Sequence, residues 1–521
     1  MPRPTKLYAP FDTAKMGRSR TPGLGDRRPH AIVIGAGFGG LAAGIRLGAR
    51  GYRVSVLDKL TTPGGRGTAF RQDGFVLDAG PTIVTAPQLF EELWALCGRR
   101  MADDVELRAL DPFYVIRFDD GETFTARPDI DAMRDEVRRI SPRDVAGYDR
   151  FMKEGAERYR IGFQGMGMIP FTRITDMLPW LPDLARLRAD RSVHGHVATR
   201  VRHPHLRAAL SFHPLFIGGD PYRVTSMYCL VSYLEAKYGV HYTMGGTNAL
   251  ARAMADLIEG QGGAIHYGQE VDEILVEGGR ARGVRTTGGT ERRAEIVVSG
   301  ADAAWTYGHL LRNARRTRWT ARKLEKSRYS MSLFVWYFGT KRQWPELAHH
   351  TIVMGPRYGG LIRDIFRTGV LAEDMSIYLH RPTATDPSVA PPGMDAFYAL
   401  VPVPHLGHGQ EWSPAEVEVY RQRLEARLEE TVMPGLRGTV VSQQIMAPPD
   451  FRDRYRSPHG AGFALEPRLL QSAWFRPHNA SEEFDGLYLV GAGTHPGAGL
   501  PGVVTSAKLL DQMVPHASEL V

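Results

Sequence analysis

Three glycines with fixed spacing are the first residues in the chain whose pattern indicates a chemistry. Gly35, Gly37 and Gly40 lie between a short β-branched run at 30–34 and a helix-like stretch at 41–49. In this context the first glycine permits a tight turn, the second lets the backbone approach a pyrophosphate, and the third packs the helix against the strand. The N–H groups at the start of such a helix stabilise an anion. The pattern therefore predicts a dinucleotide-binding segment.

An acidic residue follows at the position where such a site needs one. Asp58 stands 21 residues after Gly37, at the end of a second predicted strand over 53–57. A carboxylate there accepts a hydrogen bond from the ribose 2′-hydroxyl and repels a 2′-phosphate. The two motifs together favour a cofactor of the FAD or NAD type over NADP.

Further glycine-rich turns separate FAD from NAD. Gly65 and Arg66 lie in the run 63–67, where a loop could return to the pyrophosphate and the guanidinium offers a fixed fork of donors. The run Asp78-Ala-Gly-Pro-Thr82 follows, and residues 490–507 have the pattern of a strand, a glycine turn and a helix start. A helix N-terminus at that place can stabilise negative charge on a reduced flavin. This order of motifs resembles the amine-oxidase-like superfamily of FAD enzymes.

The resemblance becomes more specific over the rest of the chain. Stretches at 78–82, 211–220, 239–247, 379–382, 401–405, 471–478 and 491–499 are similar to bacterial-type phytoene desaturases, in order, across roughly residues 30–514. Many relatives have Glu where this chain has Asp58, which changes the reach of the side chain and not its chemistry. The resemblance implies that FAD is held by Gly35, Gly37, Gly40, Asp58, Lys59, Gly65, Arg66, Gly80, Pro81, Thr82, Val271, Gly493, Thr494, Gly502 and Val503.

The resemblance also implies a reaction. Phytoene, a membrane-dissolved hydrocarbon, would be desaturated in steps through phytofluene and ζ-carotene to neurosporene, and in many members on to lycopene, with oxygen or a quinone as the final electron acceptor. Such a substrate has no polar group, so its binding must come from burying apolar area, at about 25 cal/mol per Å². The sequence does not give the number of steps. The expected location is the bacterial cytoplasm, peripherally on the inner membrane.

One carboxylate is a candidate for catalysis. Asp176 matches an aspartate suggested for catalysis in relatives, although a solvated helix residue is the plainer alternative. Histidines also occur in the family-like stretches, where a structural role is expected for His213, His241, His405 and His495. His349 and His350 have no companion carboxylate at ligand spacing, so no metal site is predicted.

The elements that must position these residues indicate an α/β fold. Strand and helix patterns near the beginning, middle and end of the chain predict a discontinuous Rossmann-like FAD domain from 30–111, 241–310 and 483–514. The middle segment includes a predicted helix over 248–259 and a predicted strand over 283–287. A sheet-containing substrate domain is predicted from 112–140 and 311–482, with a strand over 375–380. The stretch 141–240 has a helical and aromatic texture and is the candidate for membrane contact. Residues 1–29 are predicted to be a basic mobile tail and not a signal peptide.

Composition and charge limit the alternatives. The chain has 521 residues with a net charge of +8, and its two cysteines are too few for a disulfide framework. No window reaches the roughly 18 apolar residues needed to span a bilayer. The basic stretch 312–328 fits a solvated helix face or contact with an anionic membrane, and a nucleic-acid partner is not expected without a recognised motif.

The sequence leaves two rival functions open. The first is a sister enzyme, such as another carotenoid desaturase, a saturase or an isomerase. The second is a non-catalytic isoprenoid carrier, which the intact glycines, Asp58 and Arg66 disfavour. An amine oxidase is less expected because nothing in the chain resembles an aromatic amine cage.

Overall fold

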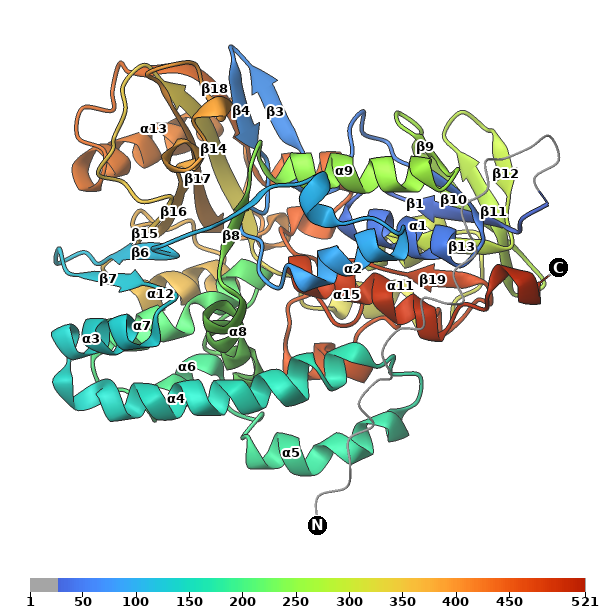
Figure 1. The fold of residues 1–521 in the computed structure, drawn as a ribbon, viewed down its shortest axis with the longest axis horizontal. Coiled ribbons are helices and arrows are strands. Elements are labelled where there is room, and N and C mark those ends of the chain that lie inside the picture. Colours follow the sequence, from blue (N-terminus) through green and yellow to red (C-terminus); the bar gives the residue numbers. More distant parts are fainter. Residues whose placement is uncertain (1–26, 521) are drawn as a thin grey trace.

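The computed structural model describes residues 27–520, and Figure 1 shows their arrangement. The tail predicted over 1–29 lies outside the described residues, apart from 27–29. A five-stranded sheet with the order β19-β13-β1-β2-β9 lies in one part of the molecule, and all its pairings are parallel. Its strands are β1 (His30–Ile34), β2 (Arg53–Leu57), β9 (Ala264–His266), β13 (Ile296–Ser299) and β19 (Leu487–Leu489). Segments distant in sequence thus form one sheet, as the sequence predicts.

The turn that joins β1 to the first helix depends on its glycine residues. Helix α1 (Phe38–Ala49) begins directly after Gly37, and Gly35 has a φ of +94°, which favours glycine. A Cβ on Gly40 would lie 1.9 Å from the carbonyl oxygen of Gly35, so only glycine lets the helix pack this closely against the strand. Helices α9 (Thr247–Gly260) and α15 (Leu500–Lys508) pack against α1. The helix predicted over 248–259 is confirmed.

A seven-stranded mixed sheet forms the second large unit, with the order β18-β14-β17-β16-β15-β6-β7. Its pairings are antiparallel except that of β15 with β6. Its strands are β6 (Tyr114–Arg117), β7 (Thr123–Ala126), β14 (Ser332–Thr340), β15 (His350–Val353), β16 (Ile377–His380), β17 (Asp395–Val403) and β18 (Val440–Met446). The strand predicted over 375–380 is confirmed except for its first two residues.

Strand β14 is apolar without alternation because both of its faces are covered. Phe334 and Trp336 pack in one cluster with the buried side of α13 (Pro414–Thr431). Val335 and Tyr337 point the other way and pack with Phe75 of β4. A strand buried on both faces loses the usual alternation of apolar and polar residues.

Three smaller sheets complete the strand set. They are β3 (Ala69–Gln72) with β4 (Phe75–Asp78), β5 (Leu107–Ala109) with β8 (His241–Thr243), and β10 (Val271–Glu277) with β11 (Arg280–Thr286) and β12 (Glu291–Arg293). The strand predicted to begin at 283 begins at Arg280 instead. Gly278 and Gly279 both have positive φ and form a two-residue hairpin turn, which extends the pairing to Glu277 and Arg280.

The stretch 141–240 is helical, as predicted, and no strand occurs in it. In Figure 1 its helices α4 and α5 form the lower edge of the molecule. Its helices are α4 (Val145–Arg158), α5 (Leu181–Arg186), α6 (Val193–Val197), α7 (Pro204–Ser211) and α8 (Leu230–Tyr238). The remaining helices are α2 (Gln88–Leu96), α3 (Ile130–Ile140), α10 (Ala303–Trp305), α11 (Ala321–Lys326), α12 (Tyr358–Arg363) and α14 (Pro448–Tyr455). Within residues 27–520, no helix combines the length and the apolar character needed to cross a bilayer.

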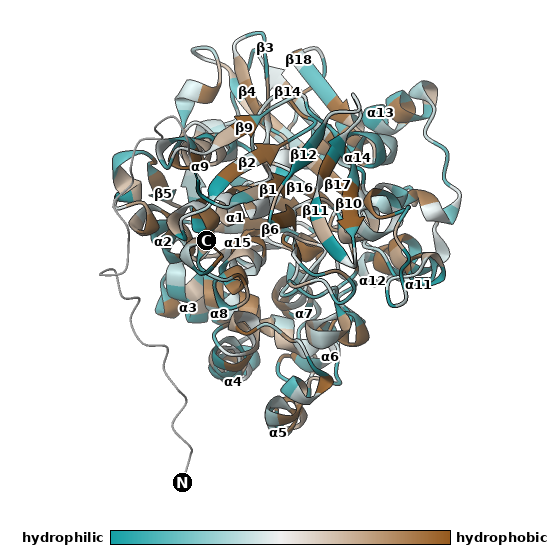
Figure 2. Cartoon of the chain, turned by 90° about the vertical axis from the view of Figure 1, so that its right-hand side faces the viewer, coloured by the Kyte–Doolittle hydropathy of each residue, from teal (hydrophilic) through white to brown (hydrophobic). Residues whose placement is uncertain are grey.

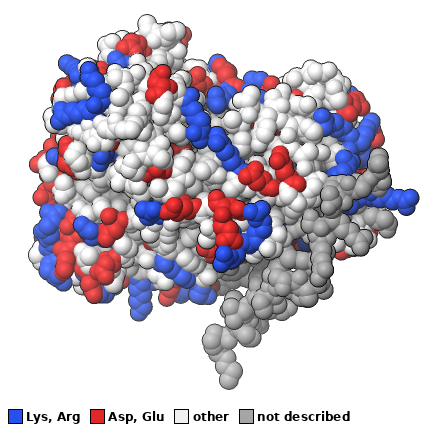
Figure 3. All heavy atoms as spheres, turned by 45° about the horizontal axis from the view of Figure 1, so that its top comes forward, with Lys and Arg blue, Asp and Glu red and all other residues white. Residues whose placement is uncertain are grey.

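The basic stretch 312–328 is only partly a helix. Helix α11 covers its second half, whereas Arg312 pairs with Asp272 at 2.5 Å and Arg318 with Glu482 at 3.0 Å. The interpretation as a helix face is therefore wrong for the first half of the stretch, where Arg312 and Arg318 pair with other parts of the fold and stay 36% and 35% exposed. Figure 3 shows one face of the molecule, on which positive and negative side chains are interspersed.

Candidate functional site

A cavity of about 630 Å³ is lined by residues of the parallel sheet, the mixed sheet and the helical region. Most of the predicted cofactor residues lie in its wall. They are Gly35, Gly37, Asp58, Lys59, Gly65, Arg66, Gly80, Pro81, Thr82, Val271, Gly502 and Val503. Gly40, Gly493 and Thr494 are not among the described lining residues. The structure therefore brings together residues from five separate stretches of the sequence.

Two glycine loops meet at the cavity wall. The N–H of Gly64 donates to the carbonyl of Ala36 at 2.8 Å, and a Cβ on Gly65 would lie 3.1 Å from the Cα of Gly37. A Cβ on Gly37 itself would meet no atom closer than 4.0 Å. The protein thus leaves space at Gly37, where the backbone faces the cavity, and this is the space that a pyrophosphate needs.

Asp58 is fixed beside this loop at the end of β2. Its Oδ2 accepts a hydrogen bond from the N–H of Ala36 at 2.6 Å, and its Oδ1 accepts one from Leu60 at 2.7 Å. Burial raises the pKa of Asp58, while the two N–H groups act in the opposite direction. The neighbouring Lys59 donates to the carbonyl of Asp453 at 2.8 Å. The carboxylate is therefore held at the cavity wall by the same turn that the glycines form.

Arg66 faces the cavity with part of its hydrogen-bonding capacity unused. Its Nη2 donates to the hydroxyl of Ser457 at 2.5 Å, but its buried Nε has no partner among the described residues. Asp302 also lines the cavity, and its buried Oδ2 is likewise without a partner there. A buried guanidinium with a free donor is suited to a phosphate. The residues present therefore fit an FAD pyrophosphate.

The segment 78–82 lies between the two large sheets. A Cβ on Gly80 would be 1.9 Å from the carbonyl oxygen of Arg66, so the chain can pass there only with glycine. The hydroxyls of Thr82 and Tyr378 lie 2.5 Å apart, which ties the segment to β16. Asp78 accepts from the N–H of Thr247 at 3.0 Å, and burial raises the pKa of its carboxyl to about 7.

The C-terminal glycine turn is positioned by a buried arginine that sequence reasoning missed. Arg476 donates to the carbonyls of Thr494 at 3.1 Å and Ala492 at 2.7 Å. The turn leads into α15, and its first residues, including Gly502, line the cavity. His495 also lines it, with Nε2 3.0 Å from the carbonyl of Met166, and burial lowers the pKa of His495 to about 3. This imidazole is therefore neutral.

Comparison with known proteins identifies the family. Residues 38–509 match the flavin containing amine oxidoreductases. The phytoene desaturase (neurosporene-forming) of Rhodobacter capsulatus is 55% identical over 503 residues, which cover 95% of each chain. The chain belongs to the bacterial phytoene desaturases. The phytoene desaturase (lycopene-forming) of Pantoea ananas is 43% identical over 477 residues, 91% of this chain and 97% of that protein.

Solved structures show the same fold. Putrescine oxidase bound to putrescine superimposes with a TM-score of 0.60, at 15% sequence identity, over 94% of this chain and 98% of its own. A parallel Rossmann-like sheet beside a mixed sheet is thus the architecture of this family of flavin enzymes. The sequence predicted this α/β architecture from the order of its motifs.

Asp176 lies at a different kind of position from the predicted cofactor residues. Its Oδ2 accepts hydrogen bonds from the N–H groups of Arg173 at 2.8 Å and Thr172 at 2.9 Å, and these bonds lower the pKa of Asp176. Its neighbour Met177 lines the cavity, but Asp176 is not among the described lining residues. In this structure the carboxylate caps a short turn, and its catalytic role stays a prediction.

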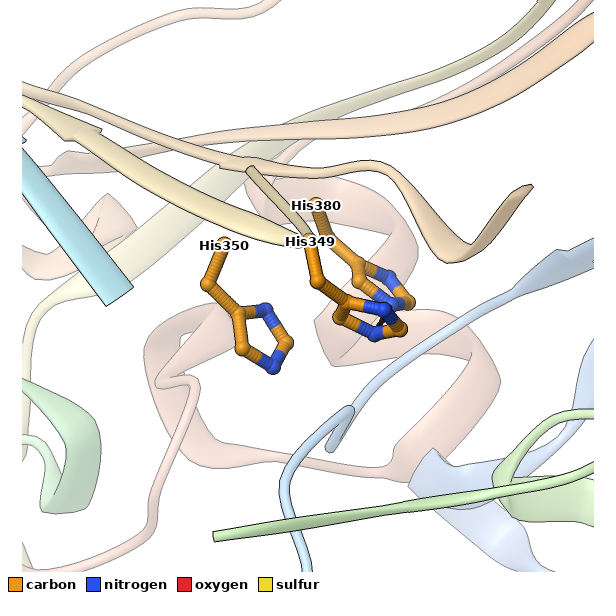
Figure 4. Close-up of side chains that lie close together, drawn as sticks. All are labelled: His349, His350 and His380. Atoms are coloured by element: carbon orange, nitrogen blue, oxygen red, sulfur yellow. Dashed lines mark hydrogen bonds between the residues drawn. The ribbon is translucent and has the colours of Figure 1, made fainter. Parts of the chain in front are cut away.

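Three buried histidines, His349, His350 and His380, lie close together (Figure 4). His380 of β16 is directly opposite His350 in the sheet, and ligand atoms of these two and His349 lie within 4.8 Å of one another. The Nε2 atoms of His349 and His380 are 3.1 Å apart. Burial lowers the pKa of all three, that of His349 to about 3. The prediction of no metal site considered only the neighbours His349 and His350, because sequence spacing does not reveal a partner on the adjacent strand.

Proposed function

We propose that this chain is an FAD-dependent phytoene desaturase that forms neurosporene. The observation that carries the proposal is the continuous cavity, which joins the predicted cofactor residues to walls of apolar side chains. The 55% identity to a neurosporene-forming relative, against 43% to a lycopene-forming one, supports this end product. The membrane association and the acceptor, oxygen or a quinone, are part of the same proposal.

The predicted residues would hold FAD by its charged and polar groups. The open backbone at Gly37 and the unused donor of Arg66 suit the pyrophosphate, and the Asp58 carboxylate suits the ribose. The N-terminus of α15, with Gly502 and Val503, would lie near the flavin ring. FAD supplies the oxidant that takes a hydride from the substrate.

The remaining cavity walls would bind and orient the hydrocarbon. They come from the helical region and the mixed sheet, and they include Phe212, Phe216, Leu230, Leu234, Tyr378 and Leu400. A polyene that offers no hydrogen bond is held by apolar contact alone, and these walls also exclude water from the reacting carbons. We propose that hydride departure toward an allyl-stabilised cation comes first and that proton loss follows.

An exposed apolar surface next to the cavity would let the substrate enter from a bilayer. Ile174, Leu178 and Leu181 are 49%, 58% and 48% exposed, and Met177 and Leu184 between and beside them line the cavity. Figure 2 shows α5 projecting at the lower edge of the molecule. Exposed apolar groups of this kind mark contact sites. We therefore propose that this part of the helical region lies on the inner membrane of a bacterial cell, on the cytoplasmic side.

Incubation of the purified chain with FAD and phytoene-loaded liposomes, followed by pigment chromatography, tests the proposal. Neurosporene as the main product supports it, and lycopene as the main product would contradict this end product. Bound FAD without conversion of phytoene would point to a sister enzyme. A purified protein that binds phytoene but takes up no FAD would instead be an isoprenoid carrier. The visible absorbance of flavin in the purified protein separates the enzyme from the carrier.

A further inference from the structure

One carboxylate in the cavity wall lies apart from the predicted cofactor residues. Glu235 of α8 is 5% exposed, and it lines the cavity beside Leu234, Leu230 and Phe212. The other charged side chains among the described lining residues are Asp58, Lys59, Arg66, Glu270, Asp302, Arg454 and Arg456. These are linked to one another around the predicted cofactor site. Glu235 is the charged group that faces the apolar part of the cavity.

The contacts around Lys59 and Arg66 show this separation. Glu270 lies 3.9 Å from Lys59 and 2.8 Å from Arg456. The negative charge of Asp302 stabilises the charged form of Arg66, and the positive charge of Arg454 stabilises the charged form of Asp58. None of these contacts involves Glu235. A carboxylate in a wall of apolar side chains carries a desolvation cost, which a function can explain.

Two buried side chains, Tyr114 and His213, hold Glu235 in place. Its Oε2 accepts a hydrogen bond from the hydroxyl of Tyr114 at 3.3 Å and lies 3.2 Å from Nε2 of His213. The same nitrogen lies 3.1 Å from the Tyr114 hydroxyl. Burial, with the nearby Glu235, raises the pKa of Tyr114 well above its ordinary value, so this side chain stays a phenol. Within the described chain, the basic side chain that contacts the Glu235 carboxylate is His213, and no arginine or lysine pairs with it.

A short chain of contacts joins this cluster to the predicted cofactor segment. The hydroxyl of Thr82 meets that of Tyr378, and the Tyr378 ring lies 5.8 Å from the Phe216 ring, centroid to centroid. Phe216 in turn lies 6.5 Å from the His213 ring. Glu235 is thus connected to the segment 78–82 through His213, Phe216 and Tyr378, and both Glu235 and that segment line the cavity.

We propose that Glu235 is the base that accepts the substrate proton in the desaturation; this rests on the proposed function. At one carbon a C–H bond breaks and its electron pair leaves as hydride to the bound flavin, the oxidant. At the adjacent carbon a second C–H bond breaks, the proton passes to the Glu235 carboxylate, and the electrons of that bond form the new C=C bond. The proposed acceptor, oxygen or a quinone, would take up the two electrons, and the proton can pass on to His213.

Neither the hydrocarbon nor the apolar wall supplies a base of its own. The substrate carries no lone pair that could take up the proton, and an apolar wall keeps water away from the reacting carbons. A carboxylate held in the wall by two hydrogen-bonding partners is a suitable acceptor, and general bases of this kind contribute typically 10²–10⁴-fold in rate.

The Glu235→Gln variant tests the proposal because it keeps the shape of the side chain and removes the base. The full-length FAD-loaded protein is mixed with phytoene-loaded liposomes without oxygen, and the loss of flavin absorbance and the product are followed. We expect FAD content and phytoene retention to stay at the wild-type level, and desaturation to slow by about 10²–10⁴-fold. With phytoene deuterated at the proton-losing carbon, the isotope effect should be larger in the variant than in the wild type.

Two further variants complete the experiment. Glu466→Gln changes a buried carboxyl that is not among the described lining residues, and it should leave rate and isotope effect unchanged. Glu235→Asp keeps a carboxylate base on a shorter side chain. It replaces Glu235→Gln if that variant does not fold. For Glu235→Asp, a partial loss of the desaturation rate together with a raised isotope effect supports the proposal. A Glu235 variant that keeps the wild-type rate, or slows without any change in isotope effect, overturns it. Wild-type protein that binds FAD but does not desaturate phytoene rejects the proposed function, and the role of Glu235 with it.

Discussion

Replacement of Arg66 by glutamine should weaken FAD binding by a predictable amount. The wild-type guanidinium uses Nη2 for Ser457 and keeps a buried Nε free toward the cavity. A hydrogen bond to a charged group contributes about 1.5–3 kcal/mol, and about 1.4 kcal/mol corresponds to a tenfold change in affinity. Loss of the interaction with the pyrophosphate should therefore raise the Kd for FAD by about 10- to 150-fold.

Titration of the flavin-free, full-length protein with FAD measures this effect directly, with fluorescence quenching as the readout. An excess of FAD at about 100 times the Kd should stabilise the wild type by about 2.7 kcal/mol, and the same FAD concentration should raise the Tm of Arg66→Gln by less. Arg468→Gln, which changes an arginine that is not among the described lining residues, serves as the matched control. Equal Kd values for Arg66→Gln and the wild type would refute the assignment of this side chain to the cofactor.

Three further predictions concern the membrane surface, a buried acid and the predicted catalytic aspartate. Changing the half-exposed Ile174, Leu178 and Leu181 together to serine should weaken liposome binding by about 100-fold, at about 1 kcal/mol each, while FAD stays bound; unchanged sedimentation with liposomes would exclude this surface. Burial raises the pKa of Asp78 from 3.8 to about 7, so its contribution to stability is present below about pH 4 and is lost as the pH rises toward 7. The Tm of Asp78→Asn should therefore rise relative to the wild type across this pH range, and a constant difference would contradict that protonation state. Asp176→Asn should keep wild-type turnover because the residue is not among the described lining residues; a loss of 100-fold or more would support the catalytic role predicted from the sequence.

Local patterns were enough to predict the nucleotide-binding unit. The run 30–58 forms β1, α1 and β2 because its glycines, its β-branched strands and Asp58 all specify the same local structure. Of the predicted cofactor residues, Gly40 lies behind the wall because its task is to bring helix and strand together. Agreement between local preference and the final fold explains why this part could be predicted.

Contacts between distant segments could not be predicted in the same way. His380 joins His349 and His350 only because β15 and β16 pair in a particular register. Glu235 lies on a helix, Tyr114 on a strand and His213 in a short turn, and these three elements meet only in the folded chain. Arg476 likewise contacts the glycine turn only in the folded protein. The sequence signal for such residues is weak, because a buried polar side chain and an exposed one look alike before the fold is known.

Anaerobic mixing of the FAD-loaded protein with phytoene tests most directly whether flavin and hydrocarbon share one cavity. The measurement follows the visible absorbance of the bound flavin in the absence of any other electron donor. We predict that phytoene alone removes this absorbance, that a desaturated product forms in equal amount, and that oxygen or a quinone restores the oxidised spectrum. A flavin that stays oxidised in the presence of bound phytoene would contradict the proposed function.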